Sequence, residues 1–336
     1  MISVIIPSTP IEKIITGNYK TGNRYVKILR RLGINSHLSF DYEFEQSINK
    51  TKSAILLHAK KNYKTAIICQ KRLIPYALVL TGTDIYADIT KNNSSCYEKC
   101  IDSILGAQAI IVLQPHAKKK LIDIVPDIKT KIYVIFQSTT IKTKNYFYKK
   151  SENQISILMV GNIRKEKDLV TGINGFLDTY YNSFIMTKYE ITLTHIGAEL
   201  ECEYAKLVKN LVSKSRNINF LGYKNNSDVI NEMMKSDLLL NTSVIEGGSL
   251  VIKEAIDLNL PILASNIPCH KEMLGHGYPG FFESEDHKDL SRKLQSFIVE
   301  KKIRESWKTS LSNSPITNYG RSEESKLLAD VIGSLQ

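Results

Sequence analysis

The chain has 336 residues, enough for two domains of ordinary size, and its 43% apolar and 24% charged residues are typical of a soluble globular protein. It has no apolar run of about 18 residues and no basic segment leading into an apolar leader, which argues against a transmembrane helix or signal peptide and favours a cytoplasmic protein. The net charge of +11 permits an anionic partner, but no zinc finger, recognition helix or basic-aromatic alternation accompanies it, so nucleic acid is not expected.

Short apolar runs alternate with longer amphipathic stretches from the N-terminus onward, which predicts a parallel, doubly wound α/β sheet. The first run, 2–6, is followed by a glycine-containing segment, 16–24, and then by an amphipathic helix that ends near Gly33. We interpret 16–24 as a loop that receives an anion or a sugar, with a ligand-free polar loop as the alternative. Further strands are expected at 36–40, 54–57, 76–80, 109–113 and 131–136.

Polar residues follow several of these strands, at the edge of an open α/β sheet where ligands bind. Because the carboxyl ends of parallel strands meet at one edge, these residues predict one wall of a cleft. They are His58, Lys60, Thr83, Asp84, Gln114, Gln137 and Ser138, and the loop before the first helix adds Thr21, Gly22, Asn23 and Arg24.

The strand-helix pattern breaks in a segment rich in Lys, Asn and Tyr, which we interpret as a linker at 141–154. It then resumes, with strands expected at 155–160, 191–195, 218–221, 238–240 and 262–264. The chain is therefore expected to hold two Rossmann-like domains in tandem, at 1–140 and 155–315. Two aromatic residues end strands of the second domain: Tyr223 is expected near a nucleobase, and His195 is either a site residue or a structural histidine.

The most informative stretch is Asn241-Thr-Ser-Val-Ile-Glu-Gly-Gly-Ser-Leu-Val-Ile-Lys-Glu254, which has the pattern of a strand, a glycine turn and a helix. The glycine pair lets backbone approach a ligand, and Ser249 is a suitable N-cap for a helix whose free N–H groups attract an anion. Glu246 stands at the mouth of this loop and Glu254 about 7.5 Å further along the helix axis. A phosphate between them would place a sugar near one carboxylate and a ribose near the other. The alternative is a turn residue and a solvated helix residue.

This Glu-x₇-Glu element, followed by Ala-Ile and by Leu-Pro-Ile-Leu-Ala-Ser265, resembles the donor site of the retaining glycosyltransferases of family 4, which have the GT-B fold. The resemblance implies that Glu254 binds a nucleotide ribose and Glu246 the donor sugar. It also implies that Gly247, Gly248, Ser249 and Leu250 face the sugar and the phosphates. In such proteins the last helix, here 320–336, packs back on the first domain.

The segment from Gly161 to Lys167 stands in the place of the family's Gly-Arg-x₄-Lys phosphate loop, with Asn162 where the family has arginine. We expect Arg164 to take over the diphosphate contact beside Lys167. Two cations are required because departure of a nucleoside diphosphate builds negative charge and no metal site is visible in the sequence. The resemblance implies a UDP-sugar as co-substrate, with no metal and no resident cofactor expected.

A narrower resemblance links the chain to the selenosugar synthases of selenoneine biosynthesis. It rests on Thr21–Arg24, Leu57–Lys61, Leu80–Tyr86, Val112–Pro115, Phe136–Ser138 and Tyr278–Phe282. It implies transfer of the sugar of a UDP-sugar such as UDP-N-acetylglucosamine to selenophosphate. Many family 4 enzymes carry a histidine where Thr83 stands. Its absence suits an anionic nucleophile that needs positioning more than deprotonation, although His58 is an alternative base.

Two other functions remain open. One is a family 4 enzyme that glycosylates a lipid-linked or polysaccharide acceptor, with the basic helix near 23–32 making a peripheral contact with an anionic membrane. The other is a nucleotide-sugar-binding protein without catalysis. For either enzyme the first domain is expected to form the acceptor side. Which acceptor it binds is set by its loops rather than by the fold.

Overall fold

The computed structural model describes residues 1–8, 16–90, 94–141 and 151–336. Positions 142–150, the greater part of the expected linker, lie outside them. The described chain forms two compact units. The first unit comprises Met1–Ser138, Glu246–Gly248 and Tyr319–Gln336, and the second comprises Thr139–Ile245 and Ser249–Asn318.

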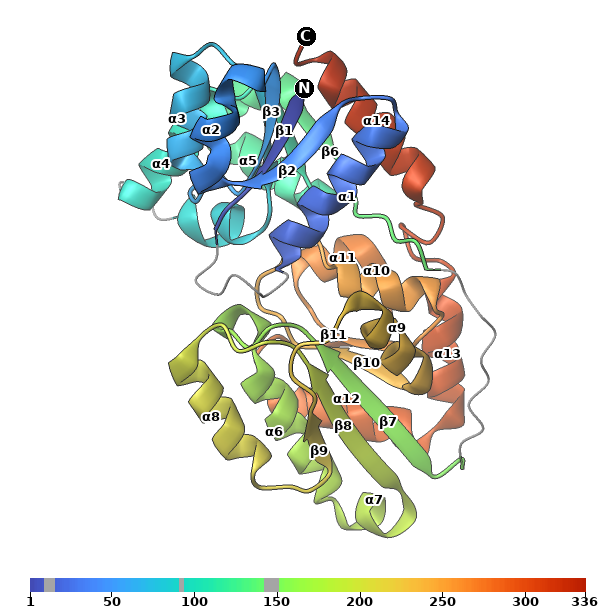
Figure 1. Ribbon diagram of the computed structural model, residues 1–336. Coiled ribbons are helices and arrows are strands. Elements are labelled where there is room, and N and C mark those ends of the chain that lie inside the picture. The colour runs from blue at the N-terminus through green and yellow to red at the C-terminus, as the bar shows by residue number, and fades with distance from the viewer. Residues whose placement is uncertain (9–15, 91–93, 142–150) are drawn as a thin grey trace. The chain divides into compact units, whose positions relative to one another are not determined.

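The first unit contains a parallel sheet with the strand order β2-β1-β3-β4-β5-β6 (Figure 1). Its strands β1, β3, β4 and β5 are buried throughout, as expected for a parallel sheet covered on both faces, while the edge strands β2 and β6 are partly buried. Their bounds are β1 (Ile2–Ile6), β2 (Ser36–Phe40), β3 (Ser53–Leu57), β4 (Tyr76–Leu80), β5 (Ala109–Val112) and β6 (Ile132–Val134). The helices are α1 (Gly17–Arg31), α2 (Phe44–Ser47), α3 (Tyr63–Lys71), α4 (Ser95–Leu105), α5 (Pro115–Ile124) and α14 (Arg321–Gly333).

The second unit repeats this design, with the strand order β12-β11-β10-β7-β8-β9, again parallel throughout. The strands are β7 (Gln154–Val160), β8 (Glu190–Ile196), β9 (Ile218–Phe220), β10 (Leu238–Asn241), β11 (Ile262–Ser265) and β12 (Phe281–Phe282). The helices are α6 (Leu169–Tyr180), α7 (Ser183–Lys188), α8 (Cys202–Val212), α9 (Asn226–Lys235), α10 (Leu250–Asp257), α11 (Pro268–Leu274), α12 (His287–Val299) and α13 (Lys301–Leu311). The predicted pair of doubly wound parallel sheets is thus confirmed.

The expected glycine loop at 16–24 is wrong, because these residues belong to α1. The helix begins one residue after Thr16, whose side chain accepts a hydrogen bond from the Tyr19 amide at 3.3 Å. Gly22 lies inside the helix, where an added Cβ would stand 2.8 Å from both Ile6 Cγ2 and Leu38 Cδ1. The glycine therefore serves close packing of the helix on the sheet, and Asn23 and Arg24 lie in the second turn rather than at the helix start.

Helix α14 lies beside α1 in the first unit (Figure 1). Its buried face, which includes Leu328, Val331 and Ile332, shares one apolar cluster with Val26 and Leu29 of α1. The last residues of the chain thus complete the core that the first residues begin. Among the described residues no helix combines the length and the apolar character needed to cross a membrane.

Candidate active site

The loops that follow β7 and β8 are bound to each other. The Gly161 amide donates to Ile196 O at 2.9 Å, the Ile163 amide donates to Ala198 O at 2.7 Å, and Asn162 Oδ1 accepts from the Ala198 amide at 3.0 Å. Asn162, which stands where the resembling family has arginine, therefore fastens this loop to its neighbour. The backbone at the start of the expected phosphate loop is thus held by hydrogen bonds to the loop after β8.

The same loop is fastened on its other side to the segment that follows β10. Thr242 Oγ1 donates to Lys167 O at 2.8 Å, and the Val244 amide donates to Glu166 O at 2.9 Å. The 161–167 loop and residues 241–245, the first part of the other stretch that the sequence marked, are thus neighbours in the second unit. Thr242 contributes to this junction and was not expected from the sequence, because a threonine after a strand carries no distinctive signal.

The side chains of Arg164 and Lys167, both in the 161–167 loop, have different surroundings. Arg164 is about one third exposed, and its Nε lies 3.9 Å from a Glu166 carboxylate oxygen, which is a long and weak ion pair. The stem of Lys167 runs across Gly161, since a Cβ added to that glycine would stand 3.3 Å from Lys167 Cδ and Cε. Asp168 then takes a left-handed conformation (φ 42°) and caps α6, its Oδ1 accepting from the Thr171 amide at 3.3 Å.

The start of α10 is set by Asn241. Its amide group donates to Ser249 Oγ at 3.2 Å, and its oxygen accepts from the Ser243 amide at 3.2 Å. Ser249 is the N-cap residue, but its side chain makes no capping hydrogen bond to the helix. Leu250 is the first helical residue, and Glu254, only 3% exposed, lies on the buried side of α10. The alternative that Glu254 is a solvated helix residue is therefore wrong.

His195 is a structural histidine of this region. Its Nε2 lies 2.8 Å from Gly161 O, so this nitrogen carries the proton and donates to the carbonyl. The side chain is 1% exposed, and burial lowers its pKa from the ordinary 6.5 to about 4, against the opposing effect of the hydrogen bond to Gly161. The histidine therefore holds the first residue of the 161–167 loop while remaining neutral.

This burial predicts a pH dependence of stability. Below pH 6.5 the unfolded chain binds a proton at His195 and the folded chain does not, so the stabilisation is complete above that pH and is lost as the pH falls toward 4. The expected loss is about 3 kcal/mol of unfolding free energy. Denaturant titrations at pH 7, 5 and 4 should show it in the wild type and not in His195→Gln. Equal pH profiles for the two proteins would contradict the assignment.

Residues 246–248 belong to the first unit, where the glycines make close backbone contacts. A Cβ on Gly247 would stand 2.4 Å from the Thr81 carbonyl, and Gly248 O accepts from Gln137 Nε2 at 2.8 Å. Glycine is thus needed at these two positions because other parts of the protein pack closely against them. The sequence had predicted glycine there for the close approach of a ligand. Glu246 is half-buried at the head of this turn.

His58, Thr83 and Asp84 lie together in the first unit. His58 Nε2 is 2.9 Å from Thr83 Oγ1, while its Nδ1 lies 3.4 Å from the donating Lys61 amide. Since Nδ1 accepts, Nε2 carries the proton and donates to the threonine. His58 is 2% exposed with φ 76°, a strained conformation of the kind that clusters at functional sites. Burial lowers its pKa, opposed by Asp84, so the ring is kept neutral.

Asp84 is a buried structural carboxylate. It accepts hydrogen bonds from the backbone amides of Thr81, Gly82, Ile85 and Ala59 at 2.8–3.2 Å, which joins the loop after β4 to the loop after β3. His58 and Thr83 are therefore the members of this cluster that could act on a substrate, and Asp84 holds the loops that carry them.

Arg24 is buried in an ion pair, in contrast to its expected place on an open wall. Its Nε donates to Glu324 of α14 at 2.8 Å, and its Nη2 donates to Gln137 Oε1 at 3.1 Å. Thr21 Oγ1 donates to the same amide oxygen at 3.3 Å, and Ser138 donates to Glu324 through both its amide and its hydroxyl. The structure thus brings four expected residues together around Glu324, which the sequence did not single out.

Two other expected residues have structural partners. Lys60, about one third exposed, pairs with Asp88. Burial lowers the pKa of Lys60, but the hydrogen bond and the charge of Asp88 oppose it and the pKa is raised overall. Gln114 is fully buried and caps α5, accepting from the Ala117 amide at 3.1 Å and donating to the Tyr86 hydroxyl. In the second unit Tyr223 follows Gly222 (φ 64°) after β9 and is 39% exposed.

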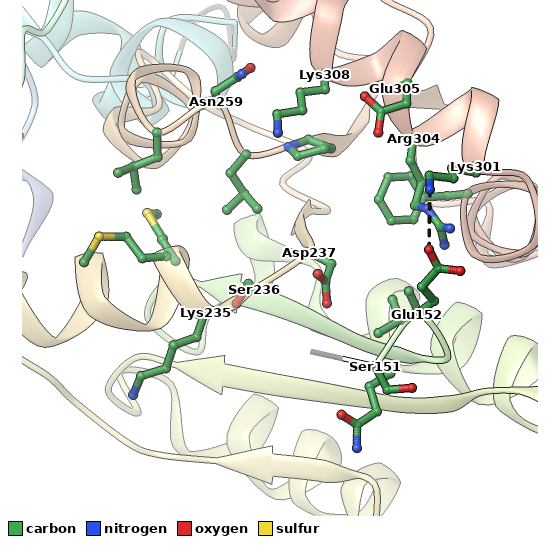
Figure 2. Close-up of a pocket in the computed structure, with 18 residues that line it drawn as sticks. Ser151, Glu152, Lys235, Ser236, Asp237, Asn259, Lys301, Arg304, Glu305 and Lys308 are labelled. Carbon is green, nitrogen blue, oxygen red and sulfur yellow. Dashed lines mark hydrogen bonds and ion pairs between the residues drawn. The ribbon is translucent and has the colours of Figure 1, made fainter. Parts of the chain in front are cut away.

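A cavity of about 460 Å³ lies elsewhere in the second unit (Figure 2). It opens where β7, β10 and β11 begin, at the opposite edge of the sheet from the loops described above. Its charges are of both signs, with Lys301 paired to Glu152 at 3.4 Å and with Arg304, Lys308, Asp237 and Glu305 around it. This balance favours no particular ligand charge, and the cavity is separate from the candidate site.

Comparison with known proteins gives concordant results. Residues 141–311, just over half of the chain, match the family described as glycosyl transferases group 1. Glycosyltransferase 1 domain-containing protein 1 of Xenopus tropicalis is 27% identical over 70% of each chain. N-acetyl-alpha-D-glucosaminyl L-malate synthase of Bacillus anthracis is 30% identical over 39% of this chain and 32% of its own.

The fold has close matches among solved structures. HepE of Anabaena, solved in complex with UDP and glucose, superposes with a TM-score of 0.75 over 99% of each chain at 14% identity. The two parallel sheets thus form the GT-B fold. Taken with the match to the family across the unit that carries the Arg164 loop and Glu254, these comparisons show that the chain belongs to the group 1 glycosyltransferases.

Proposed function

We propose that the protein is a retaining glycosyltransferase that uses a UDP-sugar and has selenophosphate as its acceptor. The observation that carries the donor half of this proposal is the junction of the 161–167 loop with the segment after β10. That junction gathers Arg164, Lys167 and the start of α10 in one region of the second unit. UDP as the nucleotide is supported by HepE, whose structure contains it.

In the proposed reaction the bond between the sugar C1 and the β-phosphate oxygen breaks, and UDP leaves with the bonding electron pair. Arg164, Lys167 and the amide groups at the start of α10 would stabilise the charge that develops on the departing phosphate. The buried carboxylate of Glu254 would accept hydrogen bonds from the ribose, and Glu246 would orient the sugar. Gly161, Asn162 and Gly247–Leu250 would line the phosphates, with Tyr223 beside the base.

Selenium of selenophosphate would attack C1, forming a C–Se bond as UDP departs. The acceptor is already an anion, so no proton has to be removed. Thr83 would donate a hydrogen bond to it, because the His58 Nε2–H group occupies a lone pair of the Thr83 oxygen and leaves the hydroxyl proton to point elsewhere. N-acetylglucosamine as the sugar is supported by the relative whose name joins a glucosaminyl group to L-malate.

A hydroxyl acceptor is the second candidate, and one observation favours it. The expected cations of the acceptor side, Arg24 and Lys60, are each paired with a carboxylate, so the charge of each is already balanced by a protein group. A lipid-linked or polysaccharide hydroxyl carries no charge on the attacking atom, so it would need a base more than a cation. His58 would meet this need in its other tautomer, with Nε2 unprotonated and accepting from the Thr83 hydroxyl, which would in turn accept the proton of the sugar acceptor.

One assay separates these functions. The protein is incubated with UDP-N-acetylglucosamine or UDP-glucose and with selenophosphate, thiophosphate or no acceptor, while UDP release and the mass of the sugar product are followed. Release that depends on selenophosphate, with a selenium-bearing sugar as product, is the expected result. Glu254→Gln is the control for donor binding and should weaken UDP binding by about 1.5–3 kcal/mol. UDP binding without release would reject selenophosphate and turn the search to hydroxyl acceptors, and failure with all acceptors would indicate a binding protein.

A further inference from the structure

Glu324 is a buried carboxylate whose two oxygens are both occupied. It is fully buried on α14. Its Oε1 accepts from Arg24 Nε at 2.8 Å, and its Oε2 accepts from the Ser138 amide at 3.1 Å and from the Ser138 hydroxyl. A buried charge is costly unless it is paired and hydrogen-bonded, as it is here. The apolar face of α14 already packs on α1, so attachment of the helix does not by itself call for a carboxylate at this position (Figure 1).

The partners of Glu324 determine the orientation of the Gln137 amide. Arg24 Nη2 and Thr21 Oγ1 both donate to Gln137 Oε1, at 3.1 and 3.3 Å. Because an arginine side chain can only donate, the atom that faces it must be the amide oxygen. The NH₂ group of Gln137 is therefore turned away from the ion pair and donates to Gly248 O. The direction of this donor thus depends on where Glu324 holds Arg24.

We propose that Glu324 is a positioning residue for sugar transfer. Through Arg24 it fixes the Gln137 amide, and through Ser138 it fixes the backbone next to that amide. The network Thr21, Arg24, Gln137, Ser138 and Glu324 then presents an oriented neutral donor beside the glycine turn of residues 246–248, and the charge of Arg24 is balanced within the network. This inference rests on the proposed function, because the turn contains Glu246, the residue proposed to orient the sugar.

Glu324→Gln tests the proposal with little change of shape. In this variant an NH₂ group replaces one of the two carboxylate oxygens. It would face a hydrogen-bond donor, either Arg24 or Ser138, so only the contact with the other partner survives. The expected result is a fall in kcat of at least tenfold, with KM for the UDP-sugar and affinity for UDP changed less than threefold. The matched control is Glu323→Gln, the preceding and exposed residue, which accepts from the Gly320 amide and should leave kcat unchanged.

A second variant and a ligand-free measurement complete the test. Gln137→Glu keeps an acceptor for Arg24 and Thr21 but removes the NH₂ donor, so it should lower kcat as Glu324→Gln does, and the double variant should lose little more. Amide hydrogen exchange of 132–141, measured without ligand, should rise in Glu324→Gln and not in Glu323→Gln. Unchanged kcat with a lowered Tm would reduce Glu324 to a structural residue and overturn the proposal. A wild type without turnover would refute the proposed function instead, and the exchange measurement would still decide on positioning.

Discussion

Replacing Gly197 with alanine is expected to cost at least about 3 kcal/mol of unfolding free energy and to abolish tight nucleotide binding. A Cβ at this position would stand 1.9 Å from Gly161 O and 2.5 Å from Gly161 C. Overpacking typically costs about 1–3 kcal/mol, and here the colliding atoms are backbone atoms that cannot rotate away. Gly161 would have to move, and with it the carbonyl that His195 holds at 2.8 Å.

The matched control is Gly277→Ala in the same unit, where an added Cβ meets nothing within 4 Å. This variant should have wild-type stability or gain about 0.4–1 kcal/mol, because alanine restricts the unfolded chain. Denaturant unfolding and titration with UDP measure the two effects separately. A stable Gly197→Ala protein that binds UDP as well as the wild type would show that the loops after β7 and β8 are not locked together.

The sequence indicated the two sheets well because several of their central strands, such as Ser53–Leu57 and Tyr76–Leu80, are short apolar runs buried throughout. The prediction at 16–24 was wrong because glycine occurs both in flexible loops and where two elements pack closely. Gly22 looks like a loop residue, yet it lies in a helix where Ile6 and Leu38 leave no room for a side chain. Only the three-dimensional neighbours distinguish these roles, and they come from β1 and β2.

The candidate residues that the sequence singled out are those that lie close to one another along the chain. Glu246 and Glu254 belong to one turn and one helix, and Gly161 and Lys167 to one loop. Glu324 is different, because its partner Arg24 lies 300 residues away and a glutamate in an amphipathic helix is ordinarily solvated. Thr242 and Asn241 are also recognised only by their contacts, since small polar residues after a strand are common. Long-range pairing of buried polar groups is therefore what the sequence alone left undetermined.

Replacing Lys167 with alanine is expected to reduce kcat for sugar transfer by about 10²–10³-fold. The proposed step builds negative charge on the departing diphosphate, and removing one preorganised group that stabilises such charge typically has an effect of this size. The stem of Lys167 crosses Gly161 and its backbone carbonyl is held by Thr242, so the main chain should keep its place when the side chain is lost. Stability should therefore change much less than kcat.

The control is Lys165→Ala, which removes an exposed lysine from the same short turn and leaves the net charge equal to that of the Lys167 variant. Wild-type kcat for Lys165→Ala and a large loss for Lys167→Ala would distinguish a local contact from a general effect of positive charge. The effect should also be specific to the transition state, so UDP affinity should fall by a smaller factor than kcat. If both variants lose activity equally, the charge acts at a distance, and Arg164 would be left as the candidate for direct contact with the diphosphate.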